Sequence, residues 1–313
     1  GANGEGAEGR RQVYDWDRYV RTIRALQPEA VISVSGPDVR WCGNEAGHTR
    51  PDEWSVVSRE LQDAERVAAH SQTSDDGRFS RFVKSGDDDL GGRKVLPDTV
   101  GDLVWYPAEV NTSTRRGWFH HAAEDAEVRS SDELFDIYQR AVGGNSTLLL
   151  NVPPTKRGRI SDADRSALEG LGTLIDELHS ASIKEIAFAC SSNPLDVEPG
   201  QILTLANDTG WWEPAADDTE PWIELTLASA CSIDGVVLKE QITQGQRIEQ
   251  IRVLRDDGAR WTPIAEIGCV GYQRICRFTP VVATRVRFEI TRSRRVPTLA
   301  GVAVLASSRQ GRS

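Results

Sequence analysis

The hydrophobic pattern of this 313-residue chain changes near Ser182, and this change most constrains its fold. Before Ser182, apolar residues with helical spacing, as in residues 15–27, alternate with short aliphatic runs such as residues 30–34. After it, short alternating runs such as residues 222–227 and 286–290 are separated by turn sequences. The sequence therefore predicts an α/β part, residues 1–181, followed by an all-β part, residues 182–313, built as an antiparallel β-sandwich or jelly roll.

The first part has the helix-and-strand order that a parallel sheet requires. Strands are expected at residues 30–34, 103–110, 117–120 and 147–151, and helices are expected to begin near Ser130 and at Ser161. The segment from about 50 to 98 has no clear periodicity and is expected to be a long excursion from the sheet. We therefore expect four parallel strands in this part of the chain.

Charge and composition exclude several classes of partner. The net charge is −10 and no run of Lys or Arg forms a basic stripe, which disfavours nucleic acid and anionic membranes and suits a neutral ligand such as a sugar. The apolar runs are far too short to span a bilayer. Five cysteines without CxxC spacing disfavour a zinc site or a disulfide framework, although a pair across one hairpin stays open for Cys269 and Cys276. We expect neither a metal nor a cofactor.

Three segments of the first part, in this order, resemble the α-L-fucosidases of glycoside hydrolase family 29: residues 36–45 (GPDVRWCGNE), 116–121 (RGWFHH) and 145–154 (NSTLLLNVPP). The resemblance implies a (β/α)8 TIM barrel, of which residues 1–181 would form the C-terminal half. It also implies a retaining exo-α-L-fucosidase that removes terminal α-1,3- or α-1,4-linked fucose from a glycan. The second part more loosely resembles the discoidin, or coagulation factor 5/8 type C, β-sandwich at residues 207–212 (NDTGWW) and 221–225 (PWIEL).

Glu45 is the candidate acid/base. Its position alone favours a solvated loop carboxylate, but the resemblance implies that it is the acid/base of the branch acting on α-1,3 and α-1,4 linkages. The family nucleophile is an aspartate whose following segment matches residues 1–6 (GANGEG), so it would stand immediately before Gly1. We therefore expect the chain to begin inside the catalytic domain and, alone, to be inactive.

Further residues are candidates for substrate binding at the ends of the strands. The aromatic ring of Trp118 would suit the C5-methyl face of fucose, although barrel packing is the alternative role. Either His120 or His121 could bond a sugar hydroxyl, and either could be an ordinary surface histidine. Glu109 and Asn151 are expected to be site residues or hydrogen-bonding groups of the rim. The remaining candidates, beside Glu45, are Arg40 and Trp41.

Two other functions stay open at this point. One is a carbohydrate-binding or adhesion protein that uses the sandwich, with Trp211 and Trp212 as the better ligand candidates, Trp261 as a further one, and Trp222 as a core residue. The other is an inactive remnant of a fucosidase. The expected partner is a fucosylated oligosaccharide, and the oligomeric state is not predicted. We expect a secreted or periplasmic protein, whose signal peptide would precede Gly1.

Overall fold

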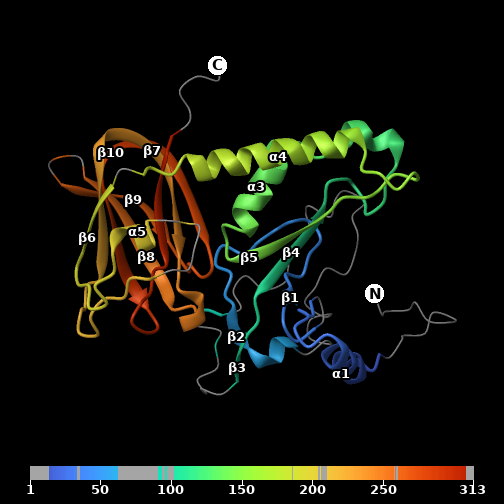
Figure 1. Ribbon diagram of the computed structural model, residues 1–313, viewed down its shortest axis with the longest axis horizontal. Coiled ribbons are helices and arrows are strands. Elements are labelled where there is room, and N and C mark those ends of the chain that lie inside the picture. Colours follow the sequence, from blue (N-terminus) through green and yellow to red (C-terminus); the bar gives the residue numbers. More distant parts are fainter. Residues whose placement is uncertain are drawn as a thin grey trace.

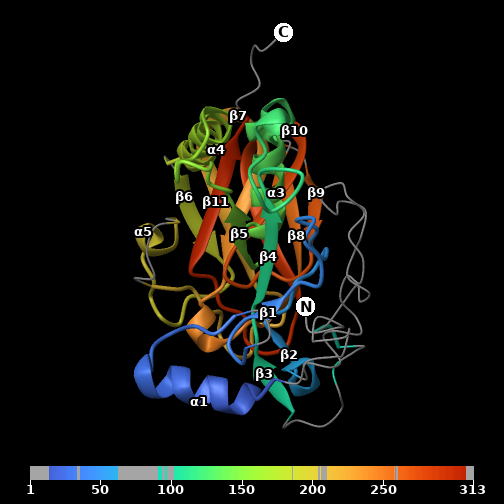
Figure 2. The same ribbon diagram turned by 90° about the vertical axis from the view of Figure 1, so that its right-hand side faces the viewer.

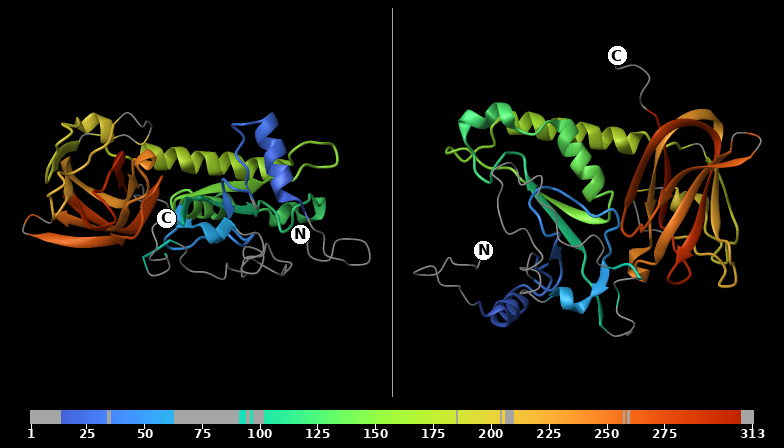
Figure 3. Two further views of the ribbon diagram at one scale, coloured as in Figure 1. Left: turned by 90° about the horizontal axis from the view of Figure 1, so that it is seen from below. Right: turned by 180° about the vertical axis from the view of Figure 1, so that it is seen from behind.

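The computed structural model describes residues 14–33, 36–62, 91–93, 96, 102–184, 186–203, 205, 210–256, 258 and 260–307. An α/β body and an all-β body lie side by side, and the chain passes between them after the long helix α4 (Figure 1). Helix α4 lies at one end of the α/β body and α1 at the other (Figures 2 and 3).

A small parallel sheet forms the centre of the α/β body. Its strands are β1 (Arg40–Trp41), β4 (Ala108–Ser113) and β5 (Ser146–Asn151), in the order β1-β4-β5. Helices α3 (Ser131–Ala141) and α4 (Asp162–Ser180) pack on one face, where their apolar side chains contact Leu148 and Leu150 of β5. The hydroxyls of Ser130 and Ser161 cap the two helices, which confirms both predicted helix starts.

The opposite face of this sheet is polar and partly open. Leu149 of β5 is 52% exposed, because it points away from the helices that cover its neighbours. The register pairs Asn111 with Leu149 and Ser113 with Asn151, so these side chains share that face. Trp41 pairs with Glu109 on the same side. The face therefore presents an indole, amides, a hydroxyl and a carboxyl group rather than a continuous apolar surface.

Two of the four predicted parallel strands are not formed. Residues 30–33 have no strand pairing because the turn that follows occupies the backbone of Ile32: its carbonyl accepts from the amides of Asp38 and Val39, and its own amide donates to the carboxylate of Asp38. Val34 lies outside the described residues. Residues 117–120 form a largely exposed bend and pair with no strand in the part of the chain that the structure describes. Among the described residues the parallel sheet thus has three strands, and the eight-stranded barrel stays a prediction.

The predicted strand at residues 103–110 is two strands with different partners. β3 (Leu103–Trp105) pairs antiparallel with β2 (Val56–Ser58), whereas β4 joins the parallel sheet. The break falls at Tyr106 and Pro107, and proline has no amide hydrogen to continue a ladder. Part of the expected excursion is therefore folded back on the body: Trp54, Val57 and Tyr106 share a small buried cluster.

Helix α1 (Trp16–Leu26) confirms the helix predicted at residues 15–27. Asp15 caps it by accepting from the amide of Arg18. Its apolar face is exposed, with Trp16 at 44% and Leu26 at 72%. The other short helical segments of the described residues are η2 (Arg59–Gln62), η3 (Ala122–Glu127), α5 (Pro199–Ile202) and η4 (Ile242–Gln244).

The all-β body is an antiparallel sandwich in which two long strands serve both layers. These are β7 (Trp222–Lys239) and β10 (Arg274–Ser293), which pair along most of their lengths. The first half of β7 pairs with β6 (Ile186–Cys190) and its second half with β11 (Gly301–Ala306), while the end of β10 pairs with β8 (Ile248–Asp256), which pairs with β9 (Trp261–Ile267). Register shifts in β10 near Arg277 and Ala283 bend this strand, so that it runs from one layer into the other. Strands β7 and β10 are therefore longer than the short runs predicted from the sequence.

The core of this body lies between the layers and contains Ile223, Leu225, Val236, Val253 and Phe288, all unexposed. A second apolar cluster joins the two bodies: Leu178 at the end of α4 packs with Val237, Ile275, Ala303 and Leu305 of the sandwich. All five cysteines lie in the described residues and are free thiols, so the pairing left open for Cys269 and Cys276 is not formed.

Candidate active site

The loop that carries Glu45 follows β1 and therefore lies at the carboxyl edge of the parallel sheet. Asn44 gives the loop its shape: its side-chain oxygen accepts from the amides of Ala46 and His48, both at 3.1 Å, and its amide group donates to the carbonyl of His48 at 3.2 Å. Asn44 is 1% exposed, whereas the neighbouring Glu45 is half-buried. The turn around Asn44 thus places the carboxyl group of Glu45 outside the interior of the loop.

Glu45 meets Trp118 at this edge. The indole Nε1 of Trp118 donates to the Oε2 of Glu45 at 3.3 Å. The bend that holds Trp118 is fixed by two further contacts: the amide of Asn151 donates to the carbonyl of Trp118 at 3.2 Å, and Ser113 Oγ donates to the carbonyl of Gly117 at 2.8 Å. Glu45 after β1, Trp118 after β4 and Asn151 at the end of β5 therefore meet at one site on the carboxyl edge of the sheet.

Trp41 is held at the same site by Asn111, a residue that was not predicted from the sequence. Its Nε1 donates to the Oδ1 of Asn111 at 2.8 Å and to the carbonyl of Asn44 at 3.1 Å. The alternation of Glu109, Asn111 and Ser113 along β4 is a signal that could have identified Asn111, because polar residues two apart in a buried strand share one face.

Arg40 and Glu109 are both buried and bond other groups than Glu45. Arg40 is 3% exposed and its guanidinium forms an ion pair with Glu53, while its Nε donates to the carbonyl of Tyr106 at 3.0 Å. Glu109 is 6% exposed and accepts from Ser33 Oγ at 2.5 Å. These contacts favour a structural role for Arg40, in place of the substrate contact expected from the sequence. Glu109 lies on the polar face of the sheet, where it is buried against Ser33.

The two histidines lie beside a buried network rather than beside Glu45. His120 Nε2 is 3.5 Å from a carboxylate oxygen of Asp125, and the carbonyl of His121 accepts from Arg115 at 3.2 Å. Arg115 is completely buried and bonds Asp164 at 2.7 and 2.9 Å. Burial would raise the pKa of Asp164, but hydrogen bonds from Arg115, Thr114 and Ser161 outweigh it and hold this pKa below its usual range. The network ties the bend containing Trp118 to the start of α4.

A second buried carboxylate, Glu53, lies behind the loop of Glu45. It is unexposed and accepts from both Arg40 and Arg50. Burial would raise the pKa of Glu53, yet the charges and hydrogen bonds of the two arginines lower it. Arg50 also donates to the carbonyl of Cys42 at 3.3 Å, which joins the two ends of the loop. Burial raises the pKa of the Cys42 thiol, so this cysteine is not a thiolate nucleophile at neutral pH.

Three tryptophans of the sandwich make structural contacts, whereas the indole nitrogen of Trp211 is buried without a hydrogen-bond partner among the described residues. Trp212 is unexposed and its Nε1 donates to the carbonyl of Ser192 at 2.8 Å, so the prediction of an exposed ligand-binding Trp212 is wrong. The guanidinium carbon of Arg287 lies 4.5 Å from the ring centre of Trp222 and 4.4 Å from that of Trp261, so it covers both rings. Trp222 is half-buried beneath this guanidinium on the outside of the sheet, and is not part of the core between the layers.

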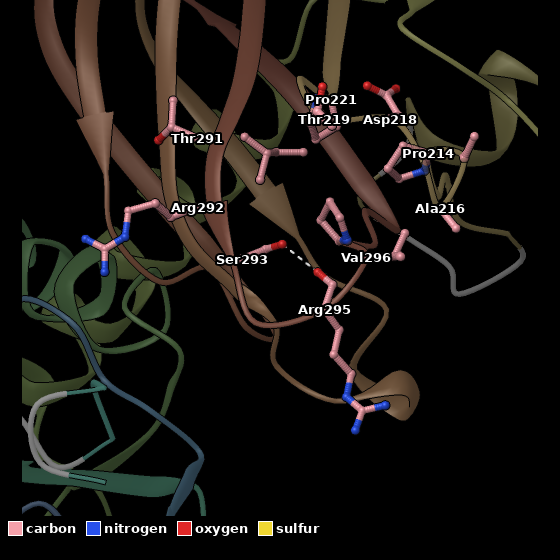
Figure 4. Close-up of a pocket in the computed structure, with 13 residues that line it drawn as sticks. Pro214, Ala216, Asp218, Thr219, Pro221, Thr291, Arg292, Ser293, Arg295 and Val296 are labelled. Carbon is pink, nitrogen blue, oxygen red and sulfur yellow. Dashed lines mark hydrogen bonds between the residues drawn. The ribbon is translucent and has the colours of Figure 1, made fainter. Parts of the chain in front are cut away.

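A cavity of about 240 Å³ lies at one end of the sandwich, between residues 214–221 and 290–297 (Figure 4). The carboxylate of Asp218 is already engaged, because it accepts from Ser192 Oγ and from the amide of Glu220. The guanidinium groups of Arg292 and Arg295 point away from the cavity in Figure 4. The three charged side chains that line the cavity are therefore either engaged or turned outward.

Two family models match the chain, one on each body. Residues 12–177 match the α-L-fucosidase model and residues 188–301 match the F5/8 type C domain. The chain belongs to the α-L-fucosidase family. Members of this family are glycoside hydrolases. The second match agrees with the antiparallel sandwich described above.

Named fucosidases are similar to almost the whole chain. Alpha-L-fucosidase 1 of Arabidopsis thaliana is 30% identical over an alignment of 311 positions that covers 96% of this chain and 55% of that protein. A crystal structure of a putative α-L-fucosidase from Bacteroides ovatus superimposes with a TM-score of 0.75 at 33% identity, covering 100% of this chain and 48% of the other. An aspartate-to-alanine mutant of a glycoside hydrolase family 29 fucosidase from Ruminococcus gnavus, in complex with fucose, gives 0.75 at 25% identity, covering 98% and 60%.

This chain spans about half the length of the curated relatives that it matches. Within the part of the chain that the structure describes, no group of three or more His, Cys, Asp or Glu residues is arranged to hold a metal ion. No helix in that part is both long enough and apolar enough to cross a membrane.

Proposed function

We propose that this chain forms the acid/base side of the active site of a retaining exo-α-L-fucosidase, with Glu45 as the acid and then the base. The hydrogen bond between Trp118 and Glu45 at the carboxyl edge of a parallel sheet carries the proposal, in a chain of the α-L-fucosidase family. The carboxyl edge is where α/β enzymes of this kind place their reacting groups.

The proposed substrate is a glycan that ends in α-1,3- or α-1,4-linked L-fucose. Trp118 is 36% exposed, so part of its indole is available to stack on the apolar face of a sugar. The contacts from Asn151 and Ser113 fix the backbone of its bend, and the contact with Glu45 orients the ring. The same indole would therefore contact the sugar and hold the carboxyl group beside the glycosidic bond.

The reaction would proceed in two displacements. In the first, Glu45 gives its proton to the glycosidic oxygen as the bond to the anomeric carbon breaks, while a second carboxylate attacks that carbon and forms a glycosyl-enzyme. In the second, Glu45 takes a proton from the water that attacks the same carbon, and the carboxylate leaves. We assign the attacking carboxylate to no residue of this chain. The proposal therefore concerns an enzyme in which Glu45 and that carboxylate are both present.

The test compares Glu45→Gln with the parent enzyme on two fucosides that differ in leaving group. A natural fucosyl oligosaccharide needs the proton, so its kcat should fall by about 10²–10⁴-fold, whereas an activated aryl fucoside should lose far less in the first step. Azide should partly restore turnover of the aryl substrate and yield a fucosyl azide. Glu127→Gln, an exposed carboxylate on η3, is the matched control and should retain parental rates. Parental cleavage of the oligosaccharide by Glu45→Gln would refute the role of Glu45.

A further inference from the structure

The sandwich grips one short segment of the α/β body, residues 51–55. The side-chain oxygen of Gln246 accepts from the amide of Ser55 at 2.7 Å, and the amide of Cys269 donates to the carboxylate of Asp52 at 3.0 Å. Arg274 donates to the carbonyl of Pro51 at 2.8 Å. We call residues 51–55 the gripped segment.

The carbonyl of Glu53 is the centre of this contact. It accepts from Asn145 Nδ2 at 2.8 Å and from Gln246 Nε2 at 3.5 Å, and the thiol of Cys269 lies 3.5 Å away. Asn145 in turn accepts from the amide of Tyr272 at 2.7 Å, so its side chain faces the sandwich, and its backbone has a positive φ of 66°. Gln246, Asn145 and Cys269 are all buried, so these bonds are shielded from water.

The other side of the gripped segment holds the loop of Glu45. The backbone of Glu53 faces the sandwich, whereas its carboxylate binds the guanidinium groups of Arg40 and Arg50. Arg50 closes the loop through the carbonyl of Cys42, and Arg40 belongs to β1, from which the loop leaves. A single residue therefore connects the sandwich to both ends of the loop.

We propose that the β-sandwich positions the acid/base loop, with Gln246 as the positioning residue that holds Glu53 from behind. The effect on catalysis rests on the proposed role of Glu45. The contact by which the sandwich restrains the loop does not depend on that role. Gln246 touches no reacting group. It acts by limiting the movement of Glu53, and therefore of the arginines that fix the two ends of the loop.

The direct test is hydrogen exchange in the Gln246→Ala variant. The amides of Ala46 and His48, which bond Asn44 inside the loop, should exchange about tenfold faster than in the parent, since one buried hydrogen-bonding partner of the gripped segment is lost. Amides in the core of β10 should keep their parental rates. Gln250→Ala is the matched control, because this glutamine bonds only Glu266 and Thr291 within the sandwich.

A milder variant guards against a folding defect. Arg274→Ala removes the bond to Pro51 from the rim of the contact and should speed exchange of the same amides by a smaller factor. Arg252→Ala is its control, since Arg252 pairs only with Glu289 on the sandwich surface. Unchanged exchange in the loop of either gripping variant, or acceleration spread evenly over both bodies, would overturn the proposal.

The kinetic test uses the native enzyme and separates this inference from the proposed function. Gln246→Ala should lower kcat for the poor-leaving-group oligosaccharide about tenfold, with KM and the rate on the aryl fucoside little changed, because a displaced acid matters only where a proton is needed. A loss of folded enzyme would instead lower both rates equally. If Glu45→Gln discriminates between the substrates and Gln246→Ala does not, the inference fails alone. If Glu45→Gln does not discriminate, the function fails and hydrogen exchange still decides the link.

Discussion

At the scale of single residues, Glu240 shows how a buried carboxyl group can set the pH dependence of stability. Its carboxyl oxygens accept from the amides of Arg247 at 2.6 Å, Ile248 at 2.9 Å and Gly271 at 2.6 Å, which joins two loops of the sandwich. Burial raises the pKa of Glu240 to about 7, although these amides and the charge of Arg247 oppose the rise. Glu240 is 3% exposed, so water screens little of this effect.

The sign of the effect follows from the folded pKa lying above the ordinary value of 4.5. Between these two values the folded state holds the proton and the unfolded state has lost it. The contribution of Glu240 to the free energy of unfolding is therefore complete below about pH 4.5 and declines as pH rises to 7, by about 1.4 kcal/mol per pH unit.

Urea unfolding of the parent and of Glu240→Gln from pH 5 to 8 would measure this contribution. The parent should lose stability with pH more steeply than Glu240→Gln up to about pH 7, and the two slopes should then converge. Glu266→Gln, an exposed residue of β9, should follow the slope of the parent. Parallel slopes for the parent and Glu240→Gln would show that Glu240 does not titrate in this range.

At the scale of elements, the stability of the first turn of α4 depends on hydrogen bonds to the bend that follows β4. Asp164, in the first turn of α4, accepts from Thr114 at 2.7 Å and from the fully buried Arg115. Asp164→Asn would set an amide against the guanidinium of Arg115 and leave the half-exposed Asp125 as the carboxylate that pairs with this charge. We expect a loss of about 3–5 kcal/mol in the free energy of unfolding at pH 7, measured in urea.

The neighbouring Asp162 is the natural comparison for that variant. Its side chain is 95% exposed and pairs only with the exposed Arg165 on the helix surface. Asp162→Asn should therefore change stability by less than about 1 kcal/mol. Equal effects of the two substitutions would mean that the buried network does not stabilise the start of α4.

Local patterns predicted the elements whose partners are close in sequence. Helix α1 and the capped starts of α3 and α4 follow from spacing and from Ser130 and Ser161, because a helix bonds within itself. Strands depend on partners that the pattern does not reveal. Residues 30–33 have the composition of a buried strand, yet the turn at Asp38 takes the hydrogen bonds of Ile32.

The same distinction applies to the candidate site. Glu45, Trp118 and Trp41 were identified from motifs, and the structure brings them together, although their roles stay predictions. Arg40 stands one residue before Trp41, and alternation sends its side chain to the opposite face and into the ion pair with Glu53. Glu53 was not predicted at all. Its burial depends on Arg40 and Arg50, which the fold brings around it, and no local pattern in the sequence marks such a carboxylate.

At the scale of the whole molecule, the two bodies share an apolar contact as well as the gripped segment. Leu178 is 3% exposed and packs against side chains of the sandwich. Leu178→Ala should lower the free energy of unfolding by about 2–5 kcal/mol. Since the contact belongs to both bodies, peptides of α4 and of β10 should still lose hydrogen-exchange protection at one common urea concentration.

Leu195→Ala provides the control for this prediction, because Leu195 is a sandwich residue that is 51% exposed. It should leave the urea midpoint nearly unchanged. Two separate transitions in the parent protein, one for each body, would contradict the view that they form one cooperative unit.

The contact at Gly271 has a consequence for how such enzymes can recombine. Gly271 has a φ of +67°, and a Cβ built on it would lie 2.2 Å from the side chain of Asn145, so the buried amide of Asn145 leaves no room for a side chain at this position. A chimera that exchanges the sandwich at residues 181–185 cuts the chain once but replaces one side of this close fit. Only donor sandwiches with a glycine there should graft well, and crossover points in natural hybrids should keep Asn145 and Gly271 from the same parent.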